Sequence, residues 1–300
     1  MTDLFKSGYA SIVGRPNVGK STLLNCLMAK KVAVTSNRPQ TTRNKITGVL
    51  HLPGAQIILV DTPGIHQSDR TLNEMMVRAS VSTFSDVDLL LVMLSAESGF
   101  CVEDEFVLNS MRGVKTKKVL VINKVDLVDK SNLLILMDEM NKKSLFEEII
   151  PISALKEDGL NQLKSLIINY LPEGPEYFPK DMDTDCPETF LFGELIREKI
   201  LKLTRFEIPH SVAVVVEDMY EQNNGVVQID ATIYAEKDSQ KKILIGERGS
   251  MLKNIGRQAR QDIEKRIGAK IFLKLFVKVK ANWRDQKKTI KEFGYTHDSF

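Results

Sequence analysis

Residues 14–21, with the sequence GRPNVGKS, constrain the fold more than any other part of this 300-residue chain. They match the pattern G-x-x-x-x-G-K-[ST], in which two glycines let backbone N–H groups turn inward around phosphate oxygens. An apolar run at 9–13 precedes the loop and a helical pattern at 21–28 follows it. We therefore expect a buried strand, a phosphate loop and a helix, in that order, with the helix N-terminus favouring an anion.

Two later motifs fall where a sheet built around such a loop would place them. Residues 61–64 (DTPG) follow an apolar run at 55–60, and residues 123–126 (NKVD) follow another at 118–122. The Pro53-Gly54 turn predicts that the run at 55–60 pairs antiparallel with the run before it, at the edge of the sheet. Alternating strands and helices predict a mostly parallel sheet with helices on both faces, and the remaining strands are expected at 45–52, 88–94 and 149–152.

The side chains of these motifs are suited to a nucleoside triphosphate with Mg²⁺. Lys20 can reach the β- and γ-phosphates, while the Ser21 hydroxyl and the Asp61 carboxylate can bind Mg²⁺, the latter through water. The Gly64 N–H can donate to the γ-phosphate. In the polar segment 37–43, a threonine is expected to complete the Mg²⁺ shell, with Thr42 preferred and Thr41 as the alternative.

The motif at 123–126 predicts that the base is guanine. Asp126 can accept two hydrogen bonds, from N1–H and the exocyclic amine, which adenine does not offer, so an ATP-using enzyme conflicts with this residue. Asn123 can donate to the purine and tie neighbouring loops together, and the Lys124 stem can lie along the ring. Ala154 can place its N–H near guanine O6. The predicted GTP/GDP site comprises Gly14, Asn17, Val18, Gly19, Lys20, Ser21, Thr22, Asp61, Gly64, Asn123, Lys124, Asp126, Ser153, Ala154 and Leu155.

A segment rich in proline and acidic residues divides the chain. Residues 173–187 are predicted to link a domain at 1–172 to a second domain at 188–300. From Lys241 onward the chain carries 16 basic and 6 acidic residues, net +10, whereas residues 1–240 carry a net charge of −7. The basic tract favours contact with phosphates. The second domain is expected to have the order α-β-β-α-β-α, from a helix at 188–206, strands at 211–217 and 226–236, a helix from Ser250, a strand at 271–280 and a helix at 284–293.

The motifs GRPNVGKS, PQTTR, DTPG, NKVD and SAL occur in this order over residues 14–155 and resemble the guanine-nucleotide motifs of translation-factor-related GTPases. Together with the C-terminal unit they resemble the Era family, bacterial GTPases of small ribosomal subunit assembly. The resemblance implies an α/β P-loop GTPase domain followed by an α+β type II KH domain. It also implies that the partners are the 3′ end of small-subunit ribosomal RNA and the assembling small subunit, with peripheral contact to the membrane.

Residues 246–249 match the G-x-x-G loop of KH domains, in which the glycines let the backbone approach nucleic-acid phosphates. In the helix that follows, an apolar stripe leaves the basic side chains on the remaining surface. The alternative for this basic domain is a contact with protein. The predicted RNA-binding residues are Gly246, Glu247, Arg248, Gly249, Lys253, Arg257 and Arg260.

The position that carries a water-orienting glutamine in Ras-type GTPases is Ile65 here. We therefore expect slow intrinsic hydrolysis, catalysed by Mg²⁺, Lys20 and a monovalent cation, with Thr42 and Gly64 completing the catalytic set. The resemblance to potassium-activated GTPases implies that Asn17 holds K⁺. In an alternative, the protein is mainly an RNA-binding assembly factor in which GTP turnover times release. His66 is assigned no role.

Cysteine usage and the absence of long apolar runs favour the cytoplasm. The three cysteines, Cys26, Cys101 and Cys186, are too scattered for a disulfide framework or a zinc site. The first residues contain no apolar run like that of a signal peptide, and the longest apolar stretch, 89–94, is too short to span a bilayer. A monomer is expected.

Overall fold

The glycine loop joins β1 (Lys6–Val13) to α1 (Lys20–Met28) in a computed structural model that describes residues 4–36, 41–65, 70–223 and 225–295. Gly19 has a φ of +103°, a conformation that a residue with a Cβ rarely adopts. A Cβ on Gly14 would lie 2.7 Å from the carbonyl oxygen of Met93. Glycine is therefore required at both ends of the loop, and the predicted strand, loop and helix are confirmed.

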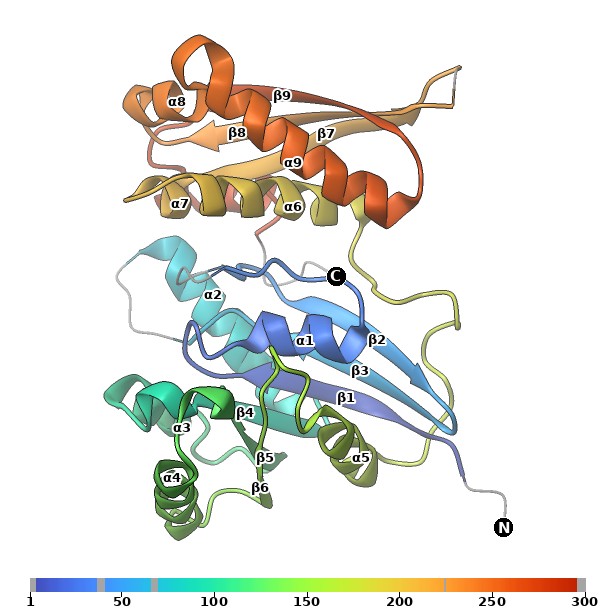
Figure 1. The fold of residues 1–300 in the computed structure, drawn as a ribbon, viewed down its shortest axis with the longest axis vertical. Coiled ribbons are helices and arrows are strands. Elements are labelled where there is room, and N and C mark those ends of the chain that lie inside the picture. Colours follow the sequence, from blue (N-terminus) through green and yellow to red (C-terminus); the bar gives the residue numbers. More distant parts are fainter. Residues whose placement is uncertain (1–3, 37–40, 66–69, 224, 296–300) are drawn as a thin grey trace.

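Among the described residues, six strands form the sheet of the N-terminal half, in the order β2-β3-β1-β4-β5-β6 (Figure 1). β2 pairs antiparallel with β3 across the turn at Gly54, and the other neighbours pair parallel, as the sequence predicts. The loops after β1, β3 and β5 thus meet at the carboxyl edge of the sheet. The strands are β2 (Ile46–Leu52), β3 (Ala55–Asp61), β4 (Leu89–Ser95), β5 (Lys117–Asn123) and β6 (Glu148–Pro151).

Helices cover both faces of this sheet, and each face has its own apolar core. On one face α1 and α5 (Leu160–Tyr170) bury leucines and isoleucines against β1, β3 and β4. On the other, α3 (Val102–Ser110) and α4 (Lys130–Lys142) pack on β4 and β5. α2 (Thr71–Ser82) reaches towards the C-terminal half (Figure 1).

The C-terminal half contains two helices that the sequence analysis missed, the four-residue α7 (Ile208–Ser211) and α8 (Asp238–Ile245). The described order is therefore α-α-β-β-α-α-β-α rather than α-β-β-α-β-α, and α8 lies directly before the G-x-x-G loop. Its buried face consists of Gln240 and Leu244, and the Gln240 side chain accepts the N–H groups of Glu236 and Lys237. A polar residue on the buried face hides the apolar helical period.

β7, β8 and β9 form the sheet of this half, in which β7–β8 is antiparallel and β8–β9 parallel. α6, α8 and α9 pack on one face of it around a shared apolar core. β7 begins and ends later than predicted, and the last helix is shorter. The elements are α6 (Glu188–Leu203), α7 (Ile208–Ser211), β7 (Ala213–Glu221), β8 (Val227–Ala235), α9 (Ser250–Ile267), β9 (Ile271–Val279) and α10 (Lys287–Glu292).

The segment between the halves lies along the edge of the first sheet. The Val49 N–H donates to the Asp183 carbonyl (2.9 Å), and the Thr184 hydroxyl donates to the Thr47 carbonyl (2.6 Å). Gln56 donates from its side chain to the Phe178 carbonyl (2.7 Å). The connection is therefore held against β2 and β3 by specific hydrogen bonds. Across the described part of the chain, no helix is long and apolar enough to cross a membrane.

Candidate nucleotide and nucleic-acid sites

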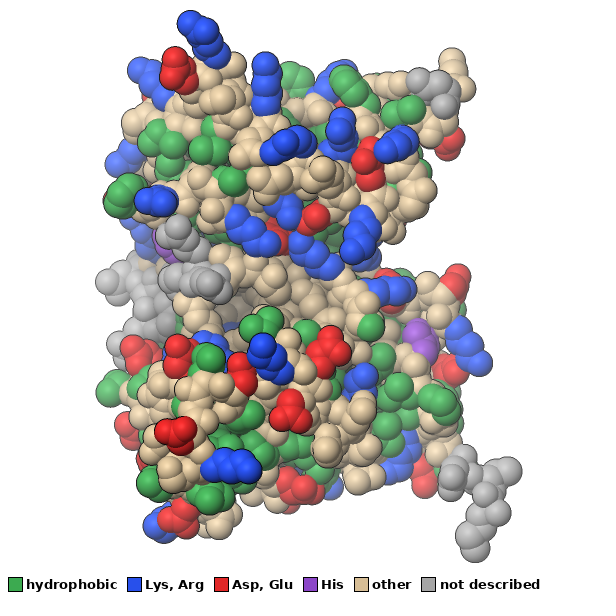
Figure 2. Space-filling view, viewed as in Figure 1, with side chains coloured by type: hydrophobic (Ala, Val, Ile, Leu, Met, Phe, Trp, Pro, Cys, Tyr) green, Lys and Arg blue, Asp and Glu red, His purple; other side chains and the backbone are tan. Residues whose placement is uncertain are grey.

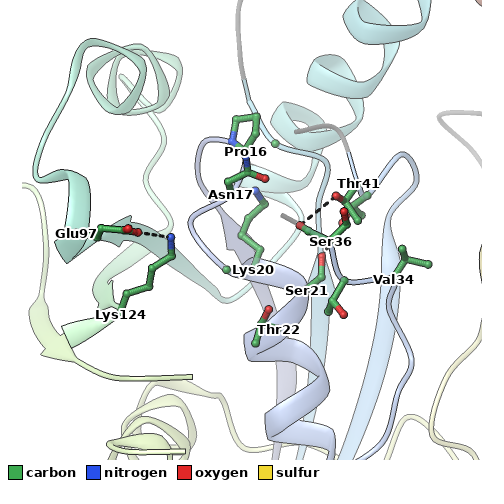
Figure 3. Close-up of a pocket in the computed structure, with 14 residues that line it drawn as sticks. Pro16, Asn17, Lys20, Ser21, Thr22, Val34, Ser36, Thr41, Glu97 and Lys124 are labelled. Carbon is green, nitrogen blue, oxygen red and sulfur yellow. Dashed lines mark hydrogen bonds and ion pairs between the residues drawn. The ribbon is translucent and has the colours of Figure 1, made fainter. Parts of the chain in front are cut away.

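A cavity of about 440 Å³ opens beside the phosphate loop, at the carboxyl edge of the first sheet (Figure 3). Most predicted phosphate and metal residues line it, whereas Gly14, Val18 and Asp61 lie buried behind its wall. The loop between α1 and β2 supplies the opposite wall. The lining residues are Pro16, Asn17, Gly19, Lys20, Ser21, Thr22, Val34, Thr35, Ser36, Thr41, Thr42, Gly64, Glu97 and Lys124.

Lys20 is held inside the phosphate loop by the loop's own backbone. Its ammonium donates to the carbonyls of Gly14 (3.0 Å) and Arg15 (2.9 Å). Burial lowers the pKa of Lys20 to about 8, although the nearby Asp61 carboxylate opposes this effect. A phosphate in the cavity would offer the ammonium a charged partner and favour its protonated form.

The structure brings together the three side chains predicted to bind the metal. Ser21 Oγ donates to Asp61 Oδ2 (2.7 Å), Thr42 Oγ1 lies 3.2 Å from the same oxygen, and the two hydroxyls are 2.7 Å apart. Thr41 instead donates to the Ser36 carbonyl (3.5 Å), so Thr42 is the threonine at this cluster.

The cluster fits a hard divalent cation. Asp61 is fully buried, its Oδ1 has no hydrogen-bond partner among the described residues, and burial raises its pKa to about 6. A buried carboxylate with an unsatisfied oxygen needs a proton or a cation to offset the loss of solvation. Two hydroxyls and one carboxylate supply the oxygen ligands that Mg²⁺ prefers.

The residues after Asp61 pack tightly on the phosphate loop. A Cβ on Gly64 would lie 2.8 Å from the backbone nitrogen of Pro16, so only glycine fits. The Ile65 N–H donates to the Gly14 carbonyl (3.2 Å), and the Ile65 side chain is fully buried in the core under α3. Ile65 therefore presents no polar group to the cavity. His66 lies outside the described residues.

On the base side, Asn123 ties three loops together. Its amide nitrogen donates to the Val18 carbonyl (2.8 Å), and its amide oxygen accepts the Ala154 N–H (2.9 Å). A Cβ on Gly19 would collide with the same side chain. The Ala154 N–H, predicted to face guanine O6, thus already donates to Asn123 in this structure.

The remaining base-side residues lie at or beyond the rim of the cavity. The Lys124 ammonium pairs with Glu97 (2.8 Å), and the two residues lie on the same side of the phosphate loop (Figure 3). Asp126 is exposed in a 3₁₀ turn (Val125–Leu127) and does not line the cavity. Ser153 is buried, and Leu155 is 76% exposed.

The G-x-x-G loop joins α8 to α9 through left-handed backbone. Gly246 and Gly249 have φ values of +72° and +79°, and a Cβ on Gly246 would lie 2.8 Å from the Met251 nitrogen. Glu247 and Arg248 are exposed at its tip. In α9 the buried stripe is Ile255, Ala259 and Ile263, whereas Lys253, Arg257 and Arg260 are exposed. Figure 2 shows many Lys and Arg side chains on this half.

The residues next to Thr42 enter the C-terminal half, a contact that the sequence analysis missed. The Arg43 guanidinium is buried and donates to the carbonyls of His210 (2.9 Å) and Val212 (2.6 Å). The Arg197 guanidinium donates to the Thr41 carbonyl. α2 makes a second contact with this half, through the apolar cluster of Leu72, Met76, Ala213, Trp283, Ile290 and Tyr295. No local signal reveals such contacts, because their partners lie far away in the sequence.

Fold and site together define a P-loop GTPase joined to a KH domain. Family models describe residues 9–124 as a 50S ribosome-binding GTPase and residues 207–284 as a KH domain. The chain is 50% identical to GTPase Era of Geobacter sp. (strain M21) over 97% of its length and 98% of that protein. GTPase Era of Lactobacillus helveticus is 48% identical, over 97% and 96%. The chain belongs to the Era family of GTPases.

Two solved structures of Era share the whole fold. One is Era in complex with MgGDPNP and nucleotides 1506–1542 of 16S ribosomal RNA, with a TM-score of 0.95 and 40% identity, over 97% of this chain and 99% of that one. The other is an Aquifex aeolicus Era variant bound to GDP and aluminium fluoride, also with a TM-score of 0.95 and 40% identity, over 97% and 100%. Because each match covers nearly the full length of both chains, the two domains of this chain are arranged as in these Era structures.

Proposed function

We propose that this chain is a GTP-driven switch that binds the 3′ end of small-subunit ribosomal RNA and acts on the assembling small subunit. One observation carries the proposal: Thr42, at the metal cluster, is followed by Arg43, which is buried in the C-terminal half. A change at the γ-phosphate can thus pass from Thr42 to the adjacent Arg43, and from Arg43 through its hydrogen bonds to the RNA-binding half. The similar Era structure that contains MgGDPNP and 16S ribosomal RNA supports the same partners.

In this proposal GTP/GDP and Mg²⁺ occupy the cavity beside the phosphate loop. Ser21 and Thr42 hold Mg²⁺ with the Asp61 carboxylate behind them, and Lys20 neutralises the β- and γ-phosphates. Gly64 contributes its N–H to the γ-phosphate. Asp126 reads guanine, and Mg²⁺ supplies charge stabilisation at the transferred phosphate.

The hydrolysis rate is proposed to be low and stimulated by K⁺. Ile65 is buried, so it offers no side chain to orient the attacking water. Asn17 is exposed at the cavity with a φ of +65°, where its side-chain oxygen is available to a monovalent cation. GTP turnover in K⁺ and in Na⁺, with Asn17→Ala beside the unmodified chain, tests the idea. Equal rates in the two salts, or K⁺ stimulation retained in Asn17→Ala, would refute it.

RNA binding is proposed for the G-x-x-G loop and the exposed cations of α9. The division into domains at 1–172 and 188–300, with a linker at 173–187, belongs to the same proposal. Affinity for an RNA oligonucleotide of the 16S 3′ end, measured with a GTP analogue and with GDP, tests the coupling. Equal affinities favour the alternative of an RNA-binding assembly factor in which GTP turnover only times release.

Arg248→Ala at the exposed loop tip should weaken this RNA binding without changing nucleotide affinity. Full RNA affinity in this variant and in Lys253→Ala and Arg260→Ala would remove α9 and its loop from the site. Protein contact by the basic half would then be the better hypothesis.

We also propose a cytoplasmic monomer that touches the inner face of the cell membrane peripherally. The support is the net charge of +10 from Lys241 onward, which favours anionic lipid. Co-sedimentation with vesicles containing anionic lipid, against neutral vesicles as the control, measures the contact. Equal retention by both kinds of vesicle, or by neither, would contradict it.

A further inference from the structure

Residues 96–104 form a part of the nucleotide site that none of the nucleotide motifs supplies. They follow β4 and include a 3₁₀ turn (Ala96–Ser98) and the first turn of α3. Glu97 lines the cavity on the side away from Ser36 and Thr41, with the phosphate loop between them in the view of Figure 3. From this segment, contacts run to the phosphate loop and to the base-side loop.

The contact with the phosphate loop is a buried ion pair. The Arg15 guanidinium donates from Nε to Asp104 Oδ1 (3.0 Å), where the Asp104 side chain is 1% exposed and that of Arg15 is 16% exposed. Arg15 also donates to the Ser98 hydroxyl, and Asp104 Oδ2 accepts the Cys101 N–H (3.2 Å). A buried carboxylate paired in this way fixes its partner's geometry. The Arg15 carbonyl in turn accepts the Lys20 ammonium.

The contact with the base-side loop is more exposed. Glu97 Oε2 accepts the Lys124 ammonium at 2.8 Å, with side chains 54% and 31% exposed. Lys124 has a φ of +65°, so its backbone is fixed in an uncommon conformation. With both ends of its side chain held, the lysine stem extends along the cavity wall, where an apolar stem can lie against a purine ring.

We propose that residues 96–104 position the two parts of the nucleotide site, the phosphate loop and the base-side loop, independently of each other. Asp104 positions the phosphate loop through Arg15, and Glu97 positions the stem of Lys124. Both are positioning residues, because each acts through another side chain. Loss of Asp104 should therefore affect phosphate binding alone, and loss of Glu97 should affect base binding.

Competition of GDP and GMP against a fluorescent GDP analogue tests this in the full chain. Asp104→Asn should raise the Kd of GDP about tenfold, because a buried charge-assisted contact is lost, and raise that of GMP by a smaller factor, because GMP has only the α-phosphate to place in the loop. Glu97→Gln should raise both Kd values by the same factor, about threefold, as expected for an exposed pair. Glu105→Gln, at an exposed carboxylate that directly follows Asp104 and lies outside residues 96–104, is the matched control and should change neither value.

Ser98→Ala tests the same contact in a second variant, in case Asp104→Asn does not fold. It removes the second partner of Arg15 without leaving a buried charge, and should lower the GDP preference over GMP in the same direction by a smaller factor. An equal loss for GDP and GMP in the Asp104 and Ser98 variants indicates general loosening and overturns the proposal. An unchanged preference for GDP over GMP in both variants also overturns the proposal. Neither result depends on RNA or K⁺, so the proposed function would stand.

Discussion

The guanidinium carbon of Arg43 lies 5.6 Å from the ring centroid of Trp283 and 5.4 Å from that of Tyr295. The two rings are themselves stacked at 5.8 Å. A buried cation that lies near aromatic rings and donates to backbone carbonyls keeps favourable partners after losing its water. Because Arg43 directly follows Thr42, the same short segment contacts the metal cluster and the core of the C-terminal half.

Arg43→Ala should uncouple the two halves. RNA affinity with a GTP analogue should become equal to that with GDP, and the free energy of unfolding should fall by about 3 kcal/mol, since buried carbonyls lose their donor. Fluorescence titration with RNA and urea unfolding measure the two effects. Arg205→Ala removes an exposed arginine from the same half and is the matched control. Nucleotide-dependent RNA affinity that survives in Arg43→Ala would show that the coupling runs elsewhere.

The neighbouring threonines provide an internal comparison. Thr42→Val keeps the side-chain shape but removes the hydroxyl at 3.2 Å from Asp61, so Mg²⁺-dependent affinity for a GTP analogue should fall about tenfold. Thr41→Val alters a hydroxyl that donates to a backbone carbonyl, and should have a smaller effect. Mg²⁺ titration of the complex with a fluorescent GTP analogue measures both. A larger loss in Thr41→Val would reverse the assignment.

The phosphate half of the site was predictable because its signals are local. The glycines of residues 14–19 reveal the loop, since its backbone turns exclude other residues. The sequence could not distinguish Thr42 from Thr41 as the threonine that contacts Asp61, because the backbone conformation of one peptide unit decides which hydroxyl points inward. Contacts that depend on tertiary packing gave no sequence signal. From the sequence alone, Arg43 is a cation in a polar loop. Its partner Trp283 lies 240 residues later and contacts it only in the folded chain.

Asp126→Asn should move nucleotide preference from guanosine to xanthosine triphosphate. Xanthine carries a carbonyl where guanine has its exocyclic amine, and the new amide can donate to it. Asp126 is exposed in the described structure, so stability should change by less than about 0.5 kcal/mol. Competition binding with both triphosphates measures the preference. Asp129→Asn changes an exposed carboxylate three residues later and should leave GTP preferred. An unchanged preference in Asp126→Asn would contradict its role in reading the base.

Magnesium binding should weaken in acid because protons compete for Asp61. Burial raises the pKa of this carboxyl from 3.8 to about 6, so between these values the folded protein holds a proton that the unfolded chain has released. In the metal-free protein, stability should therefore fall as the pH rises through this window. Below pH 6, each unit should lower Mg²⁺ affinity by at most about tenfold. Calorimetric Mg²⁺ titration with a GTP analogue from pH 8 to pH 5 measures the slope.

Asp61→Asn separates this effect from protonation of the nucleotide itself. The variant should bind Mg²⁺ weakly at every pH, and its remaining slope should be that of the triphosphate alone, because the amide does not titrate in this range. The steeper slope of the unmodified protein then belongs to the buried carboxylate. Identical slopes in the two proteins would mean that Asp61 is already ionised throughout the range, and that the cation does not depend on displacing a proton from it.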